Sequence, residues 1–224
     1  MTGERLRLMI QIEESAREPF MGFIDRQHQN PTGAIGRAIG ERMVRQHALE
    51  TNWTIAELQI SPEDRVLELG FGAGRGVALA AEQAYRGSVV GIDLSTTMVQ
   101  AARRRNRAAV EAGRVTLLKG DIEALSFASE QFDKIFSIHT FYFWPEPLRI
   151  IQELSRILRP DGMLMLTLCT GRMSPSGHRT FGPLQSVLEQ RVIPGMRQMS
   201  FASASLQTGP DSRQYTNIAI VARR

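Results

Sequence analysis

Cysteine and long apolar runs are scarce in this 224-residue sequence. The single cysteine, Cys169, excludes an internal disulfide and a Cys-x-x-Cys metal pair, and it suits a reducing compartment. No apolar stretch is long enough to cross a bilayer. The segment MTGERLRLMIQIEESAREPF is broken by Glu4, Arg5 and Arg7 and lacks a signal-peptide core. We therefore expect a cytoplasmic protein with no membrane partner.

Lysine is scarce too, since only Lys119 and Lys134 occur, and the net charge of +4 and pI near 9.8 come from arginine. A basic chain suggests nucleic-acid binding. However, the one dense run, Arg103 to Arg105 with Arg107, has no aromatic side chains nearby on which bases could stack. A solvated helix face explains the run, so we expect no nucleic-acid partner.

Metal and hydrolase signatures are also missing. The histidines, His28, His47, His139 and His178, are far apart in the sequence, and no carboxylate cluster has calcium-loop spacing. No G-x-S-x-G elbow occurs, which disfavours a Ser/His/Asp hydrolase. We therefore expect no metal. The hydrophobic content of 42% is enough for one domain to bury a sheet with flanking helices.

The most informative segment is VLELGFGAGRG, residues 66–76. Its apolar residues predict a short strand buried in a parallel sheet, and glycines at alternating positions then allow a sharp turn and close approach to a ligand. The following VALAAEQA, residues 77–84, has the apolar spacing of a helix. Strand, glycine loop and helix in this order predict the first unit of a nucleoside-binding α/β domain.

Four further units follow. SVVGIDLS ends a second strand at Asp93, where an acid accepts hydrogen bonds from a ribose diol. Residues 115–118 predict a third strand, followed by Gly120-Asp121-Ile122, and residues 134–138 predict a fourth. ELSRILRPDGMLMLTLC then predicts a helix, a turn at Pro160-Asp161-Gly162 and a fifth strand.

The glycine spacing, G-x-G-x-G-x-G, differs from the G-x-G-x-x-G of dinucleotide enzymes. It resembles motif I of the class I S-adenosylmethionine-dependent methyltransferases, in which an acid two places before the first glycine, here Glu68, is also part of the pattern. The run R-I-L-R-P-D-G-M-L resembles the family's fifth unit. The resemblance covers residues 61–170 and is nearest to the group that includes ubiquinone and menaquinone biosynthesis methyltransferases.

The resemblance implies an α/β fold: a Rossmann-like, seven-stranded, mostly parallel sheet with a C-terminal antiparallel hairpin. It implies an N-terminal helical cap over residues 1–60, part of the same domain as residues 61–224. The cofactor would be S-adenosylmethionine, with S-adenosylhomocysteine as product. The implied cofactor contacts are Glu68, Gly70, Gly72 and Gly74 at the methionine end, Asp93, Leu94 and Met98 near the ribose, Asp121 and Ile122 at the adenine, and Ser137 facing the methyl group.

Two segments outside these units are candidates for the acceptor pocket. Pro31-Thr32-Gly33 and Gly36 predict a loop, after which residues 38–60 carry apolar side chains in helical order. One or two helices should cover the carboxyl edge of the sheet, where ligands of open α/β sheets bind. Candidate pocket residues there are Arg42, His47 and Trp53, although helix surface or core packing would explain all three.

The second segment is SIHTFYFW, residues 137–144, at the end of the fourth strand. Its aromatic density suggests a wall that excludes water and holds an apolar or planar acceptor, with Tyr142 and Phe143 as pocket residues. His139 is the candidate catalytic base, because a pKa near 6.5 suits proton removal at neutral pH. A structural histidine, and packing of Phe143 and Trp144 under the next helix, remain the alternatives.

The last third of the chain carries weaker signals. Residues 171–182 predict a connector and residues 182–191 a helix. Residues 199–206 and 215–222 predict two strands around a Gly209-Pro210-Asp211 turn.

We expect methyl transfer to an O, N or C nucleophile of a small molecule. A methyltransferase acting on nucleic acid or protein, and a non-catalytic adenosine-binding protein, are the alternatives. The sequence sets no oligomeric state.

Overall fold

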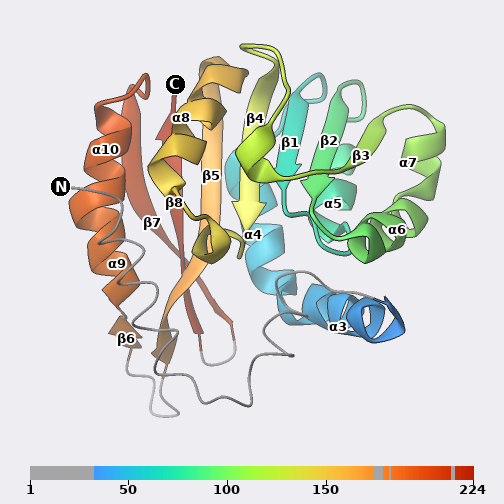
Figure 1. Cartoon of the computed structure of the whole chain (residues 1–224), viewed down its shortest axis with the longest axis horizontal. Helices are drawn as coiled ribbons and strands as arrows, with labels where there is room; N and C mark the ends of the chain where they lie inside the picture. Colours follow the sequence, from blue (N-terminus) through green and yellow to red (C-terminus); the bar gives the residue numbers. More distant parts are fainter. Residues whose placement is uncertain (1–32, 174–178, 182, 213–214) are drawn as a thin grey trace.

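One sheet organises the computed structural model, which describes residues 33–173, 179–181, 183–212 and 215–224 (Figure 1). The strand order is β3-β2-β1-β4-β5-β8-β7, with β6 paired to β5. The strands are β1 (Arg65–Leu69), β2 (Ser88–Asp93), β3 (Val115–Lys119), β4 (Phe132–Ile138), β5 (Leu158–Met173), β6 (Arg179–Phe181), β7 (Ser203–Ser212) and β8 (Tyr215–Arg223).

The first five strands are parallel, and β8 and β7 add an antiparallel hairpin beside β5. The predicted Rossmann-like, mostly parallel sheet with a C-terminal hairpin is therefore confirmed. The short β6, which pairs antiparallel with the end of β5, is an eighth strand in a segment predicted to be a connector.

Helices cover both faces of the sheet. They are α3 (Gly33–Gln46), α4 (Ala48–Leu58), α5 (Arg75–Gln83), α6 (Thr96–Arg105), α7 (Arg107–Glu111), α8 (Pro147–Ile157), α9 (Pro183–Val187) and α10 (Ile193–Arg197). In Figure 1, α8, α9 and α10 lie in front of the sheet, and α4 and α5 lie behind it. The π-helical turn Leu188–Val192 joins α9 to α10, so the helical segment predicted to end at residue 191 continues to Arg197.

Burial explains these elements. β1 is enclosed on both faces, as expected for a central parallel strand. Helix α8 begins with Pro147, which suits the first helical turn, and buries Ile150, Ile151, Leu154 and Ile157 along one stripe. One core cluster lies between the sheet and α8 to α10, and a second lies between the sheet and α4 to α6.

The strand order places a crevice at the carboxyl ends of the central strands. β1 pairs with β2 on one side and with β4 on the other, so Leu69 lies beside both Ile92 and Ser137. The chain connections diverge between β1 and β4, which is the point where open α/β sheets bind ligands. Figure 1 shows α3 beyond the carboxyl ends of these strands.

Two helices, α3 and α4, occupy the described part of the predicted cap, and residues 1–32 lie outside the described residues. The loop expected at Gly33 and Gly36 is wrong, because α3 already begins at Gly33. Gly40, a further glycine of α3, allows this helix to pack closely on α6. A Cβ at Gly40 would lie 2.8 Å from the sulfur of Met98.

Both predicted turns of the second half lie inside strands. Pro160-Asp161-Gly162 forms an irregularity within β5, where Asp161 has φ +62° and donates its N–H to the Arg224 carbonyl at 2.9 Å. Gly209-Pro210-Asp211 lies within β7, where the register with β8 shifts after Thr208. Residues that form turns also occur at β-bulges, so the sequence did not distinguish a turn from a bulge at these two positions.

No helix of the described ranges is long and apolar enough to cross a membrane.

Gly74 supplies a test of the loop geometry. It has φ +80°, and an added Cβ would lie 2.6 Å from Cβ of Ala102 and 2.7 Å from Nδ2 of Asn106. Gly74→Ala should lower the free energy of unfolding by about 2–5 kcal/mol, from backbone strain plus overpacking. The matched control is Gly113→Ala, with φ +73° and open space around it, which should cost only about 1–2 kcal/mol. Urea denaturation measures both, and equal losses would contradict the packing role.

Candidate functional site

A glycine loop connects β1 to α5 at the bottom of the crevice. Gly70, Gly72 and Gly74 have φ values of +68°, +52° and +80°, which residues other than glycine rarely adopt. The Gly70 N–H donates to the Ile92 carbonyl at 2.8 Å, and the Gly74 N–H donates to the Phe71 carbonyl at 2.9 Å. Nothing lies within 4 Å of the position that a Cβ at Gly72 would take, so the loop is open to a ligand there.

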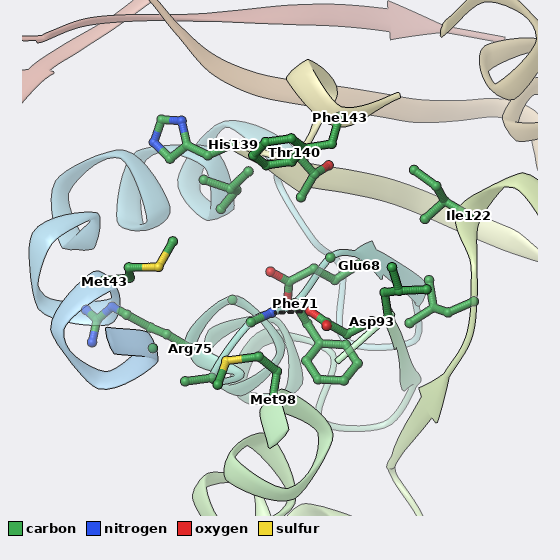
Figure 2. Close-up of a pocket in the computed structure, with 18 of the residues that line it drawn as sticks. Met43, Glu68, Phe71, Arg75, Asp93, Met98, Ile122, His139, Thr140 and Phe143 are labelled. Carbon is green, nitrogen blue, oxygen red and sulfur yellow. Dashed lines mark hydrogen bonds between the residues drawn. The ribbon is translucent and has the colours of Figure 1, made fainter. Parts of the chain in front are cut away.

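Asp93 ties this loop to the next unit. One carboxylate oxygen accepts the Gly72 N–H at 2.8 Å (Figure 2). The other accepts the N–H of Ser95, just before α6, at 2.8 Å. Burial raises the pKa of Asp93 to about 6 and outweighs these two hydrogen bonds, which act to lower it. The side chain therefore fixes the loop and still presents carboxylate lone pairs at the end of β2.

Glu68 is a buried acid beside Asp93. Its exposed fraction is 3%, and its Oε2 atom has no hydrogen-bond partner among the described residues. Burial, and then the negative charge of Asp93, hold its pKa well above the usual range. A buried, unsatisfied carboxyl oxygen is costly unless a ligand donates to it or a cation lies nearby. Glu68 therefore gives the cavity an acceptor for a donor group or a positive charge.

The cavity has a volume of about 290 Å³. Figure 2 shows Glu68 and Asp93 near its centre, Met43 and Arg75 to one side, Ile122 to the other, and His139, Thr140 and Phe143 above. The loop and strand ends supply its polar groups, whereas Met43, Val44, Met98, Ile122 and Phe143 supply apolar surface. One cavity thus joins a polar part to an apolar part.

Most of the sequence-predicted contacts meet in this cavity. The predicted residues that line it are Glu68, Gly70, Gly72, Asp93, Leu94, Met98, Asp121, Ile122, His47, His139 and Phe143. They come from the ends of β1 and β2, from the segments that follow β1, β2, β3 and β4, from α6, and from the junction of α3 and α4.

Five predicted residues do not line it. Gly74 packs against α6, and Ser137 is buried and bonds to the hydroxyl of Thr140. Arg42 is exposed on α3. The ring of Trp53 packs against Gly209 of β7, and the hydroxyl of Tyr142 donates to the Cys169 carbonyl at 3.1 Å. Trp53 follows the packing alternative, whereas Tyr142, predicted as a pocket residue, bonds the backbone of β5 instead.

Polar side chains from three elements meet at one edge of the cavity. Oε1 of Glu50 lies 2.6 Å from Nδ1 of His47 and 3.2 Å from Nε2 of His139. Burial acts to raise the pKa of Glu50, but hydrogen bonds from His139 and His47 outweigh it and hold that pKa below its usual range. Nδ1 of His139 lies 3.3 Å from the Tyr142 hydroxyl, so both ring nitrogens of His139 have partners.

Several cavity residues were missed by sequence reasoning. Phe71 and Arg75 occupy variable positions of the glycine pattern, and Met43 and Thr51 belong to helices whose placement the sequence did not define. Arg75 bonds Asn52 at 2.9 Å, and its buried Nε has no partner among the described residues. For Met43, the only indication in the sequence was the helical spacing of apolar residues within 38–60. Nothing in the sequence indicated that Glu50 belongs to the site, because its partner His139 is 89 positions away.

Comparisons with known proteins agree with this geometry. A family model described as a methyltransferase domain matches residues 67–166. The uncharacterized methyltransferase YdaC of Bacillus subtilis is 29% identical over 145 residues, which cover 64% of this chain and 78% of that protein. The ubiquinone/menaquinone biosynthesis C-methyltransferase UbiE of Syntrophotalea carbinolica is 30% identical over 168 residues, which cover 73% of this chain and 68% of that protein.

Three other curated methyltransferases match over less than half of their own length. Among solved structures, an S-adenosylmethionine-dependent methyltransferase from Aquifex aeolicus has the same fold, with a TM-score of 0.65 at 19% identity. That match covers 84% of this chain and 97% of the other. The relatives agree with the glycine loop and with the acids at the ends of β1 and β2. The chain therefore belongs to the class I S-adenosylmethionine-dependent methyltransferases.

Proposed function

We propose that this enzyme transfers the methyl group of S-adenosylmethionine to an oxygen, nitrogen or carbon nucleophile of a small, apolar or planar molecule. The observation that carries the proposal is the single cavity in which the polar glycine loop continues into the apolar side chains of Met43, Val44 and Phe143. The donor and an apolar acceptor would thus share one cavity. We also propose that it acts in the cytoplasm, as the single cysteine suggests.

The residues present suit the cofactor. Glu68 has an unsatisfied buried oxygen and Gly72 has open space in front of it, so the methionine end, which carries an ammonium group, would lie along this loop. Asp93 and Leu94 would hold the ribose, and Asp121 and Ile122 would hold the adenine. Met98 lines the same cavity below the loop. In this proposal Gly74 supports the loop by packing, and Ser137 orients Thr140.

The chemistry requires positioning more than covalent help. When bound, S-adenosylmethionine supplies a methyl group already activated by the adjacent positive sulfur. The chain has to hold the acceptor atom in line with the carbon–sulfur bond and to keep water away. Helix α3 closes one side of the cavity through Met43 and Val44, and Phe143 closes another. We propose α3 as the described part of the cap that performs this closure.

The base role of His139 stays a prediction, and the geometry does not favour it. Its Nε2 faces the buried Glu50, and its Nδ1 faces the hydroxyl of Tyr142. A general base needs a nitrogen lone pair directed at the acceptor. We therefore place His139 in the wall of the cavity.

Nucleic-acid or protein substrates are the second candidate, and the contacts of the arginine run disfavour them. Arg105 forms an ion pair with Glu41 at 2.5 Å and bonds the Ala73 carbonyl. Arg103 bonds the Leu117 carbonyl, and Arg107 pairs with Glu111. Three of the four guanidinium groups of the run are thus engaged within the domain, which supports a small-molecule acceptor over a nucleic acid.

Asp93 gives a test of the cofactor assignment. Asp93→Ala should weaken S-adenosylhomocysteine binding by about 10- to 150-fold, because the variant loses hydrogen bonds to a charged group. Such bonds contribute about 1.5–3 kcal/mol. Titration calorimetry measures the affinity, and circular dichroism checks that the variant folds. Asp64→Ala, which changes a half-buried acid just before β1, at the opposite end of that strand from the glycine loop, is the matched control and should bind normally. Unchanged affinity in Asp93→Ala would contradict the assignment.

The pH dependence of S-adenosylhomocysteine binding follows from the pKa of the Asp93 carboxyl group, which is about 6 in the protein without ligand. The ribose hydroxyls donate to the ionised form, so binding favours loss of the proton. Affinity for S-adenosylhomocysteine should therefore be full near pH 8 and fall by about tenfold for each pH unit below 6. In Asp93→Asn this slope should disappear, leaving a weaker affinity that is flat between pH 5 and 8. A slope of the same size in that variant would assign the effect to another group.

The overall function is tested by methyl transfer itself. Purified enzyme with S-adenosylmethionine should release S-adenosylhomocysteine when supplied with a panel of apolar hydroxy, amino and aromatic compounds, and the mass of one panel member should rise by one methyl group. A nicotinamide dinucleotide should not bind. If S-adenosylhomocysteine binds but no small molecule, RNA or peptide mixture is methylated, the non-catalytic alternative is correct. Methylation of RNA or peptides alone would overturn the small-molecule proposal.

A further inference from the structure

Two histidines and a glutamate that are remote in sequence meet at the edge of the cavity. His47 joins α3 to α4, Glu50 lies in the first turn of α4, and His139 follows β4. The atoms that these side chains offer to a metal all lie within 4.8 Å of one another. The sequence suggested no metal because the histidines are far apart along the chain, but the fold brings two of them together.

The surrounding structure holds the cluster in place. His139 has φ +58°, an uncommon backbone conformation for a residue other than glycine, and its N–H donates to the Thr167 carbonyl at 2.9 Å. The Tyr142 hydroxyl contacts Nδ1 of His139, which leaves Nε2 directed at Glu50. A hydrogen bond from the remote ring nitrogen to a fixed group is the usual support of a metal-bound histidine. On the other side, the Thr51 hydroxyl donates to the His47 carbonyl at 2.5 Å.

Burial and charge point to a cation. The side chain of Glu50 is 1% exposed, and those of His47 and His139 are 32% and 13% exposed. A carboxylate removed from water needs nearby positive charge. Two imidazoles and one carboxylate are a ligand set of catalytic zinc sites, which keep a further position open for water or substrate. Imidazole ligands favour Zn²⁺ and its neighbours over Mg²⁺ or Ca²⁺.

We propose that His47, Glu50 and His139 bind one divalent transition-metal ion of the Zn²⁺ type, with its open coordination position facing the cavity. The ion takes the place of the hydrogen-bonding protons between Glu50 and the two rings, and each neutral ring carries its proton on the nitrogen that does not bind metal. His47 and His139 both line the cavity, so the open position lies in the space that an acceptor would enter.

The chemical consequence rests on the proposed methyl transfer. A metal at this edge selects acceptors that carry a hydroxyl group, because binding to the ion lowers the pKa of that group. The proton leaves to solvent. The oxygen then forms a bond to the methyl carbon while the carbon–sulfur bond of the donor breaks, and S-adenosylhomocysteine leaves as a neutral thioether.

The test uses Zn²⁺ alone and the full chain, treated with chelator and then titrated against a chromophoric chelator. We expect one Zn²⁺ per chain. His47→Ala and Glu50→Gln should each weaken binding by at least about 100-fold, more than the loss of an outer-sphere partner usually costs. Glu57→Gln, on the same helix and outside the cluster, is the matched control and should bind Zn²⁺ normally. Mg²⁺ at equal concentration should not compete.

X-ray absorption of the Zn²⁺-loaded protein identifies the ligands. Nitrogen or oxygen atoms at about 2.0–2.1 Å with imidazole scattering are expected, and sulfur at about 2.3 Å is not. Sulfur scattering would move the ion to Cys169 and overturn the proposal. So would the absence of Zn²⁺ binding, or equal affinity in all variants. If Glu50→Gln fails to fold, the more exposed His47→Ala decides alone.

These outcomes are independent of the proposed function. S-adenosylhomocysteine calorimetry on the metal-free protein tests the donor site by itself. If the metal-free protein binds S-adenosylhomocysteine normally but no Zn²⁺ binds, the metal site is wrong and the proposed methyl transfer stands. If Zn²⁺ binds but S-adenosylhomocysteine does not, the metal site stands and the proposed methyl transfer is wrong.

Discussion

The two hydrogen bonds that Asp93 accepts determine the geometry on which the rest of the site depends. They connect the glycine loop of the first unit, through Gly72, to the residue before α6 in the second unit, through Ser95. Together with the hydrogen bond from the Gly70 N–H to the Ile92 carbonyl, they fix the position of the loop after β1 relative to β2. The same carboxylate is buried enough for its pKa to be raised to about 6, so the interaction is maintained against a desolvation cost. Carboxyl groups whose pKa is shifted by burial in this way cluster at functional sites.

The parallel half of the fold was predictable because its signals are local. Residues 66–76 contain the strand, the acid and the glycines of one unit, and Asp93 and Asp121 follow their strands directly. The carboxyl ends of parallel strands must lie at one edge of a sheet, so these residues meet whatever the details of packing. Nine of the eleven predicted site residues that line the cavity do so for this reason, whereas His47 and Met98 reach it from helical segments.

The remainder depended on packing that the sequence does not display. Gly74 belongs to the same pattern as Gly72, but its Cβ position is filled by Ala102 and Asn106, whereas that of Gly72 faces open space. Tyr142 and Phe143 are neighbours in an aromatic run, yet one is directed at the backbone of Cys169 and the other at the cavity. The meeting of Glu50 with His139 requires α4 to pack on β4 and β5, a contact between distant parts of the chain. Local propensity carries no information on such contacts.

The central claim is that the glycine loop and Asp93 hold the donor while the apolar side of the same cavity faces its methyl group. A crystal structure of the enzyme with S-adenosylhomocysteine tests this most directly. The account predicts ribose hydroxyls within hydrogen-bonding distance of Asp93, adenine beside Asp121 and Ile122, and the thioether sulfur directed toward the space between Met43 and Phe143. A ligand bound elsewhere, or bound here with its ribose away from Asp93, would contradict it.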